Sequence, residues 1–214
     1  MGGYFGSKAT VGLCQSIIAL MPPHDTYIET HLGGGAIMQR KPAALRNIGI
    51  DLDPQALREF AGPYPIEKVN ACAHAFLAGF DFQGRELVYS DPPYLHATRT
   101  SRRRYRFEYQ EADHLELLAL LQSLPCSVIL SGYPSALYDE HLTGWRSLEV
   151  QVMIQGRVPH RETLVQLHAR SGALAALCGA RTSPTGNGSS ARPRAGASAT
   201  GPCPRRSAWR CSRP

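Results

Sequence analysis

The tetrapeptide Asp91-Pro92-Pro93-Tyr94 combines a carboxylate, a rigid backbone and an aromatic ring, three features that can hold a polar substrate in place. Proline has no N–H group and a fixed φ, so neither proline can lie inside a central strand. The preceding residues 85–91 (RELVYSD) are rich in branched and aromatic side chains, which favours a short buried strand that ends at Asp91. In open α/β sheets the carboxyl ends of strands border the ligand crevice. We therefore interpret Asp91 as a candidate catalytic residue.

Two earlier segments have the composition of a nucleotide site. Residues 27–36 (YIETHLGGGA) place Gly33, Gly34 and Gly35 where a predicted strand turns, and glycine lets a ligand approach the backbone closely. Asp51 ends the next predicted strand, where an acid commonly accepts hydrogen bonds from ribose hydroxyls. The simpler alternatives are a flexible turn for the glycines and a solvated strand-end acid for Asp51. The glycine spacing is not GxGxxG, which disfavours a dinucleotide.

A basic segment follows the candidate catalytic loop directly. Residues 99–109 (RTSRRRYRFEY) interleave arginines with aromatic side chains. Guanidinium groups suit phosphates and guanine edges, and aromatic rings can stack on bases. We predict a DNA-contact element over residues 96–110, and the alternative is a solvated charged loop. Its arginines are Arg99, Arg102, Arg103, Arg104 and Arg106.

The elements that must position these residues alternate between strand and helix. Apolar spacing and turn residues predict helices over 9–20, 53–61, 72–80, 111–124 and 134–142, and strands over 25–31, 47–51, 85–91, 127–132 and 147–154. Asp53 has the residue type of an N-cap, with Pro54 at the first helical position. Alternation of this kind predicts an α/β, Rossmann-like fold with a parallel sheet covered by helices on both faces.

Composition restricts the class of protein. The 214 residues are 43% hydrophobic and contain no run of about 18 apolar residues, so we expect a cytoplasmic protein without membrane contact. Six cysteines form no CxxC pair and no Cys/His ligand spacing, so we expect no metal site. We also expect a monomer.

The carboxyl-terminal residues 157–214 differ in composition from residues 1–156. They contain ten arginines and one acidic residue, Glu162, and from about Arg181 they are rich in Ser, Arg, Pro, Gly and Ala without periodicity. This composition predicts a disordered, irregular basic tail. It is either a basic arm that binds nucleic acid or a tail without a selected role.

The order of these segments carries a family resemblance. Residues 2–8 (GGYFGSK), 27–36, 48–54 (IGIDLDP) and 90–99 (SDPPYLHATR) resemble the adenine-specific DNA methyltransferases of the DNA adenine methylase type, which use S-adenosylmethionine. The resemblance runs from about Gly2 to Ile154. It implies that residues 1–156 form a methyltransferase domain that modifies the exocyclic amino group of adenine in double-stranded DNA, in a setting such as restriction-modification.

The resemblance also assigns roles to residues. Its cofactor-binding set is Tyr4, Lys8, Glu29, Gly33, Gly34, Gly35, Asp51 and Asp91, and its catalytic set is Asp91, Pro92, Pro93 and Tyr94. The Asp91 carboxylate and the Pro92 carbonyl would accept hydrogen bonds from the amine as positive charge develops on its nitrogen. Tyr94 would stack on a flipped adenine, although an aromatic core residue is the alternative. Direct displacement of this kind needs no covalent enzyme intermediate.

The chain departs from the family in three places. Only 37 residues separate Asp53 from Asp91, so specificity must reside in a short element, and Cys72 falls where the family often has an acid. A carboxyl-terminal strand with a Trp-x-Asn-aromatic signature is not found after Ile154. The codons of residues 162–168 (ETLVQLH), read one base later, permit Lys-Arg-Trp-Phe-Asn-Phe-Thr, so we hypothesise a frameshift in the coding DNA.

A frameshift would leave the sheet without its final strands. The alternative function is then an inert or DNA-binding-only remnant of such an enzyme, and a third is methyl transfer to RNA or protein. Binding of S-adenosylmethionine separates the first two possibilities.

Overall fold

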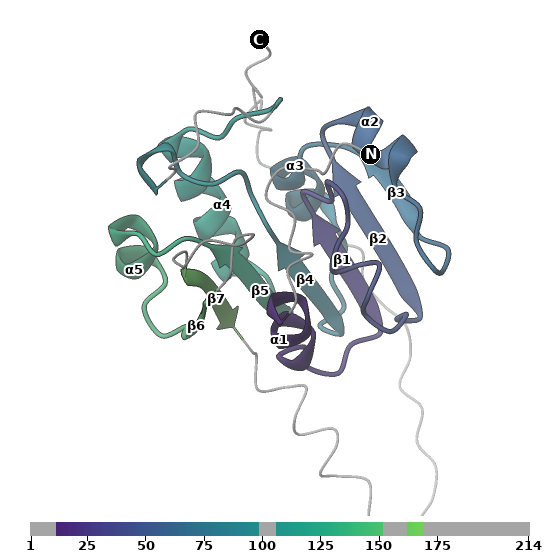
Figure 1. The fold of residues 1–214 in the computed structure, drawn as a ribbon, viewed down its shortest axis with the longest axis horizontal. Helices are drawn as coiled ribbons and strands as arrows, with labels where there is room; N and C mark the ends of the chain where they lie inside the picture. The colour runs from purple at the N-terminus through teal and green to yellow at the C-terminus, as the bar shows by residue number, and fades with distance from the viewer. Residues whose placement is uncertain (1–11, 99–105, 152–161, 169–214) are drawn as a thin grey trace, which may run out of the picture.

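The computed structural model describes residues 12–98, 106–151 and 162–168, and these form a seven-stranded sheet with helices on both faces (Figure 1). The strand order is β3-β2-β1-β4-β5-β7-β6. Neighbours from β3 to β5 pair in parallel, and β7 is antiparallel to both β5 and β6. The strands are β1 (Thr26–Thr30), β2 (Arg46–Asp51), β3 (Glu67–Asn70), β4 (Glu86–Ser90), β5 (Ser127–Gly132), β6 (Arg146–Gln151) and β7 (Glu162–His168).

The described helices are short except for one. They are α1 (Leu13–Ala19), α2 (Pro54–Glu59), α3 (Ala73–Gly79), α4 (Glu111–Ser123), α5 (Ala136–His141) and a 3₁₀ turn at His96–Thr98. The predicted start of α2 is confirmed: the Asp53 side chain accepts a hydrogen bond of 2.9 Å from the Gln55 N–H, and Pro54 is the first helical residue. None of the described helices has the length and apolar character to cross a membrane.

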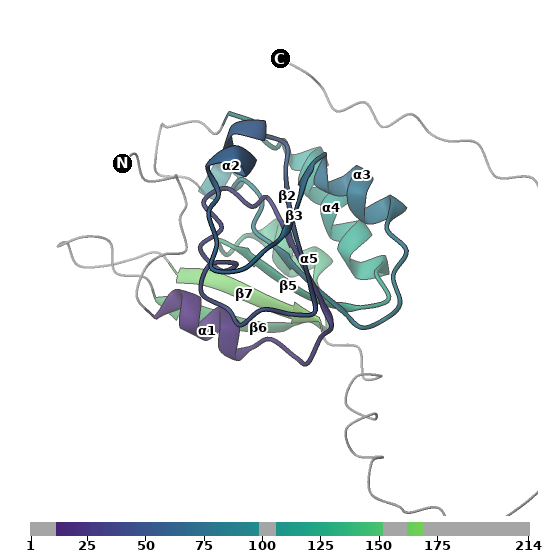
Figure 2. The ribbon, with the colours of Figure 1, turned by 90° about the vertical axis from the view of Figure 1, so that its right-hand side faces the viewer.

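The side chains of the central strands alternate between two apolar cores. In β4, Val88 packs with α3, α4 and α5, whereas Leu87 and Tyr89 face the opposite core, which includes residues of α1 and α2. Figure 2 shows α3, α4 and α5 on one side of the sheet and α1 on the other. Burial on both faces explains the continuous apolar runs in these strands. The predicted α/β, Rossmann-like fold is therefore confirmed.

The strand order reverses direction between β1 and β4. From β1 the chain proceeds outward to β2 and β3, and it then returns to place β4 on the other side of β1. Thr30 and Ser90 end these two strands in register, and the Thr30 hydroxyl donates a hydrogen bond of 3.0 Å to Ser90 Oγ. Ligands of open α/β sheets bind at such a reversal, outside the carboxyl ends of the strands.

The sheet contains two strands that the sequence did not predict. β3 (EKVN) is mostly exposed and, among the described strands, pairs with β2 alone, so its side chains show no apolar alternation. β7 lies within the stretch that we expected to be irregular, and it pairs with β5 on one side and β6 on the other. The expectation that the sheet lacks its final strands is therefore wrong, because ladders on both sides of β7 satisfy its backbone groups. Residues 157–161 and 169–214, the rest of the expected tail, lie outside the described residues.

Candidate active site at the carboxyl edge of the sheet

Asp51 fixes the glycine loop that follows β1. Its Oδ2 accepts a hydrogen bond of 2.7 Å from the Gly33 N–H, and its Oδ1 accepts one of 2.8 Å from the Asp53 N–H. Burial raises the pKa of Asp51, while these backbone donors oppose the rise. The structure therefore joins two of the segments that the sequence singled out, one after β1 and one at the end of β2.

The course of the loop depends on glycine at two positions. Gly33 has a φ of 50° and Gly35 a φ of 61°, in the left-handed region that favours glycine. A Cβ atom at Gly35 would lie 2.3 Å from Cε2 of Phe60, the residue that follows α2. Gly35 is thus required by close packing within the protein, and Gly33 by the turn that brings its N–H to Asp51.

Asp91 follows β4 directly and is oriented by the neighbouring strand β5. The Ser131 hydroxyl donates a hydrogen bond of 2.9 Å to Asp91 Oδ1. Ser131 is fully buried, and its Oγ lies 3.0 Å from the hydroxyl of Tyr89, which is also buried. Since Ser131 donates its proton to Asp91, the Tyr89 hydroxyl donates to Ser131. The carboxylate is therefore held by a directed chain of hydroxyl groups.

The loop after Asp91 presents an aromatic pair. The rings of Tyr94 and Tyr133 lie 4.3 Å apart between centroids at 49°, and Tyr133 comes directly after β5. Pro92 is buried, while Pro93 and Tyr94 are half-buried. The predicted catalytic residues Asp91, Pro92, Pro93 and Tyr94 therefore lie together at the carboxyl ends of β4 and β5.

A cluster of histidines surrounds Tyr109 at the same edge. The Tyr109 hydroxyl lies 2.8 Å from Nε2 of His31 and 3.3 Å from Nδ1 of His74, and its ring meets that of His114 edge-on at 5.5 Å. These histidines have no metal-ligand spacing in the sequence, and they are not among the predicted site residues. His31 is the last residue of the predicted strand over 25–31, whereas in the structure β1 ends at Thr30 and His31 begins the loop with a positive φ of 58°.

His74 also contacts Cys72, which precedes α3. Cys72 Sγ lies 3.6 Å from His74 Nδ1, and this hydrogen bond lowers the pKa of Cys72 to about 7. Burial lowers the pKa of His74, but its bonds with Cys72 and with the Asp113 carbonyl outweigh burial and raise it above the usual value. Within the described ranges, no group of three or more Cys, His, Asp or Glu side chains could hold a metal ion.

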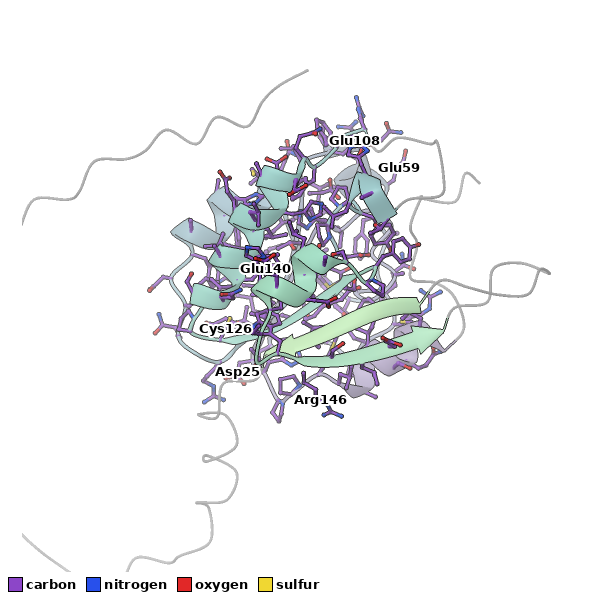
Figure 3. All side chains as sticks on the ribbon, turned by 90° about the vertical axis from the view of Figure 1, so that its left-hand side faces the viewer. Asp25, Glu59, Glu108, Cys126, Glu140 and Arg146 are labelled. Atoms are coloured by element: carbon purple, nitrogen blue, oxygen red, sulfur yellow. The ribbon has the colours of Figure 1, made fainter. Side chains whose placement is uncertain are left out.

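Of the predicted DNA-contact arginines, the structure describes Arg106. Its Nη1 lies 3.0 Å from Oδ1 of Asp53, the residue that caps α2. The Arg106 side chain remains 63% exposed, so it can still reach a second anion. Figure 3 shows Glu108, from the same segment, at the end of the molecule where Glu59 of α2 lies, and Asp25 at the other end.

Glu29 lies inside the protein, one residue before the end of β1. It is 3% exposed, and its Oε2 accepts a hydrogen bond of 2.9 Å from the Tyr27 hydroxyl. Burial raises the pKa of Glu29 to about 8, although the hydrogen bond from Tyr27 opposes the rise. Its carboxyl group faces the core on the α1 side, so its assignment to the cofactor stays a prediction from the resemblance.

The remaining predicted positions lie outside the described residues. These are Tyr4 and Lys8 near the amino terminus and Arg99, Arg102, Arg103 and Arg104 of the DNA-contact element. Gly34 lies in the glycine loop, where its carbonyl accepts a hydrogen bond of 2.7 Å from Gln39 Nε2.

No protein-family model and no curated protein matches the chain. Among solved structures, an rRNA methylase from Streptococcus thermophilus is 14% identical, with 73% of this chain and 93% of that one covered and a TM-score of 0.48. The 23S rRNA methyltransferase ErmE is 15% identical over 79% and 70% of the two chains, with a TM-score of 0.49. Magnesium protoporphyrin IX methyltransferase from Synechocystis, with bound S-adenosylmethionine, is 14% identical over 74% and 78%, with a TM-score of 0.47. At these identities the similarity concerns the fold alone.

Proposed function

We propose that this protein transfers a methyl group from S-adenosylmethionine to the exocyclic amino group of adenine in DNA. One observation carries the proposal: Asp91 is held by Ser131 at the end of β4, next to the end of β1, where Gly33 and Asp51 close a glycine loop. Asp91, which could bind the substrate amine, and the glycine loop, which could bind a nucleotide, therefore lie close together where the strand order reverses.

The residues present fit the cofactor. Each oxygen of the Asp51 carboxylate accepts one backbone N–H, and a carboxylate has about four acceptor sites, so it can also accept from ribose hydroxyls. Gly33 and Gly34, which are not buried, carry no side chain, which lets a ligand lie close to the backbone. When bound, the cofactor supplies an electrophilic methyl group.

The chain's own residues would prepare the amine for attack. Asp91 accepts one N–H of the amine and the Pro92 carbonyl accepts the other, and both interactions strengthen as the nitrogen becomes positive. The hydroxyl chain from Tyr89 through Ser131 keeps Asp91 oriented before the reaction. Tyr94 offers its ring to a base that has left the duplex.

A methyl-transfer assay tests the proposal. The full chain is incubated with tritium-labelled S-adenosylmethionine and unmethylated duplex DNA, and the DNA is hydrolysed to nucleosides. We expect label in N6-methyldeoxyadenosine. Asp91→Ala should lower the rate by about 10²–10³-fold, since one preorganised acceptor is lost.

Glu140→Ala is the matched control, because Glu140 is an exposed acid on α5 (Figure 3). Its rate should equal that of the wild type. Label in RNA or protein, with none in DNA, would overturn the choice of substrate. Failure of the folded protein to bind S-adenosylmethionine would instead indicate an inert or DNA-binding-only remnant.

A further inference from the structure

The short segment of residues 106–110 contacts the loops that follow β1 and β2, where we propose that the cofactor binds. At one end, Arg106 pairs with Asp53, which follows β2 and whose N–H binds Asp51. Near the other end, the Tyr109 hydroxyl lies 2.8 Å from His31 Nε2, directly after β1. This bridging segment belongs to the element in which we predict DNA contacts.

The direction of the hydrogen bonds at His31 follows from their partners. The Thr30 hydroxyl donates its proton to Ser90, so Thr30 Oγ1 accepts from His31 Nδ1 at 3.0 Å. His31 Nε2 then has no proton and accepts from the Tyr109 hydroxyl. In agreement, burial and the neighbouring His74 and His114 lower the pKa of His31 to about 3, so the ring is neutral.

The Tyr109 ring is enclosed independently of this bond. It stacks on His74 at 5.5 Å and 30°, and it meets His31 and His114 edge-on at 5.3 Å and 5.5 Å. These histidines come from α3, from the end of β1 and from α4. A phenylalanine at position 109 would keep the ring contacts and remove the contacts of the hydroxyl, the short one with His31 and the longer one of 3.3 Å with His74 Nδ1.

His31 needs a partner to hold its backbone. Its φ of 58° is left-handed, a conformation that is unfavourable for a residue other than glycine. It stands two residues before Gly33, so its conformation determines where the Gly33 N–H meets Asp51. The bond to Tyr109 favours the conformation in which the loop is formed.

We infer, on the basis of the proposed function, that Tyr109 is a positioning residue that couples the binding of nucleic acid to the binding of the cofactor. DNA that holds the bridging segment in place stabilises the Tyr109–His31 bond and hence the formed glycine loop. A cofactor bound in the glycine loop stabilises the formed loop and therefore the same Tyr109–His31 bond. Because coupling between two binding sites is reciprocal, each ligand should raise the affinity of the other.

The test measures DNA affinity with and without the cofactor product. A fluorescent 20-base-pair duplex is titrated with the full chain, alone and with saturating S-adenosylhomocysteine. We expect the wild type to bind DNA about 5–50-fold more tightly with the product present, within the usual range of coupling. Tyr109→Phe should bring this ratio close to 1 while both ligands still bind.

Tyr138→Phe is the matched control. It also removes a tyrosine hydroxyl that bonds a histidine, but that histidine is His114, whose Nδ1 lies 3.1 Å away, and the bond joins α5 to α4. The control should keep the wild-type ratio. Equal ratios in wild type and Tyr109→Phe, or a ratio of 1 in the wild type, would overturn the inference and leave the proposed function intact. A folded wild type that binds neither ligand would overturn both.

Discussion

The Ser131 hydroxyl and the Asp91 carboxylate, 40 residues apart in the chain, are joined by a hydrogen bond of 2.9 Å between neighbouring strand ends. This bond fixes the group that we expect to accept the substrate amine. It also places the buried Tyr89 hydroxyl behind Ser131, so orientation of the carboxylate depends on two strands at once.

We expect Ser131→Ala to slow methyl transfer by about 10-fold and to have a smaller effect on cofactor affinity. A hydrogen bond to a charged group contributes about 1.5–3 kcal/mol, and a loss of about 1.4 kcal/mol in transition-state stabilisation lowers the rate tenfold. Single-turnover rates and S-adenosylhomocysteine titrations measure the two quantities. Ser123→Ala is the control, because the Ser123 hydroxyl donates a hydrogen bond of 2.7 Å to the Leu120 carbonyl of its own helix. A full rate in Ser131→Ala would show that Asp91 needs no support from β5.

Gly35→Ala should destabilise the fold more than Gly144→Ala. Both residues have a positive φ, 61° and 85°, so each alanine costs roughly 1–2 kcal/mol of backbone strain. At Gly144 a Cβ would meet no atom within 4 Å, whereas at Gly35 it would clash with the Phe60 ring. Overpacking of that kind adds about 1–3 kcal/mol. Urea unfolding of the two variants measures the difference, and equal losses would contradict the packing of Phe60 against the loop.

Glu29 should make the protein less stable as the pH rises from about 4.5 to about 8. Burial raises its pKa from 4.5 to about 8, so in this range the folded state keeps a proton that the unfolded state has lost. Stability from this group is complete below pH 4.5 and decreases by up to about 1.4 kcal/mol per pH unit until pH 8.

Glu29→Gln keeps an acceptor for the Tyr27 hydroxyl and removes the titration. The difference in unfolding free energy between variant and wild type should therefore grow in favour of the variant across this range. Denaturant unfolding at pH 5, 6.5 and 8 measures it. A constant difference would mean that Glu29 titrates as it does in the unfolded chain.

We expect weaker DNA binding when Arg102, Arg103 and Arg104 are replaced together by glutamine. The slope of log affinity against log salt concentration should become shallower by the equivalent of up to about three phosphate contacts. Arg106→Gln should change the slope by at most about one contact, because its guanidinium already pairs with Asp53. Affinity measured from 50 to 300 mM salt gives both slopes. An unchanged slope in the triple variant would place these arginines away from DNA.

Sequencing of the gene tests the frameshift hypothesis. If it holds, the frame one base later encodes an aromatic-Asn-aromatic strand at the codons of Glu162 to His168, the residues that form β7 here. An early stop in that frame, or no such strand, would favour a basic arm as the account of residues beyond 168.

The sequence alone determined the features that depend on short stretches of chain. Asp53 and Pro54 predicted the start of α2, and apolar runs predicted the four parallel strands β1, β2, β4 and β5. The two prolines predicted that Asp91 lies at the end of a strand. Each of these depends on backbone preferences and burial within a few residues, which composition and periodicity report directly.

Only the tertiary structure decided which side chains meet. His31 and Tyr109 are 78 residues apart, and Asp53 and Arg106 are 53 apart, so their contacts depend on how the crossovers return to one edge of the sheet. β7 likewise lies between β5 and β6 and forms backbone hydrogen bonds with both. These pairings stabilise a strand within residues 157–214, whose composition predicted an irregular chain. Pairing partners of this kind are set by long-range backbone geometry, which no local pattern in the sequence records.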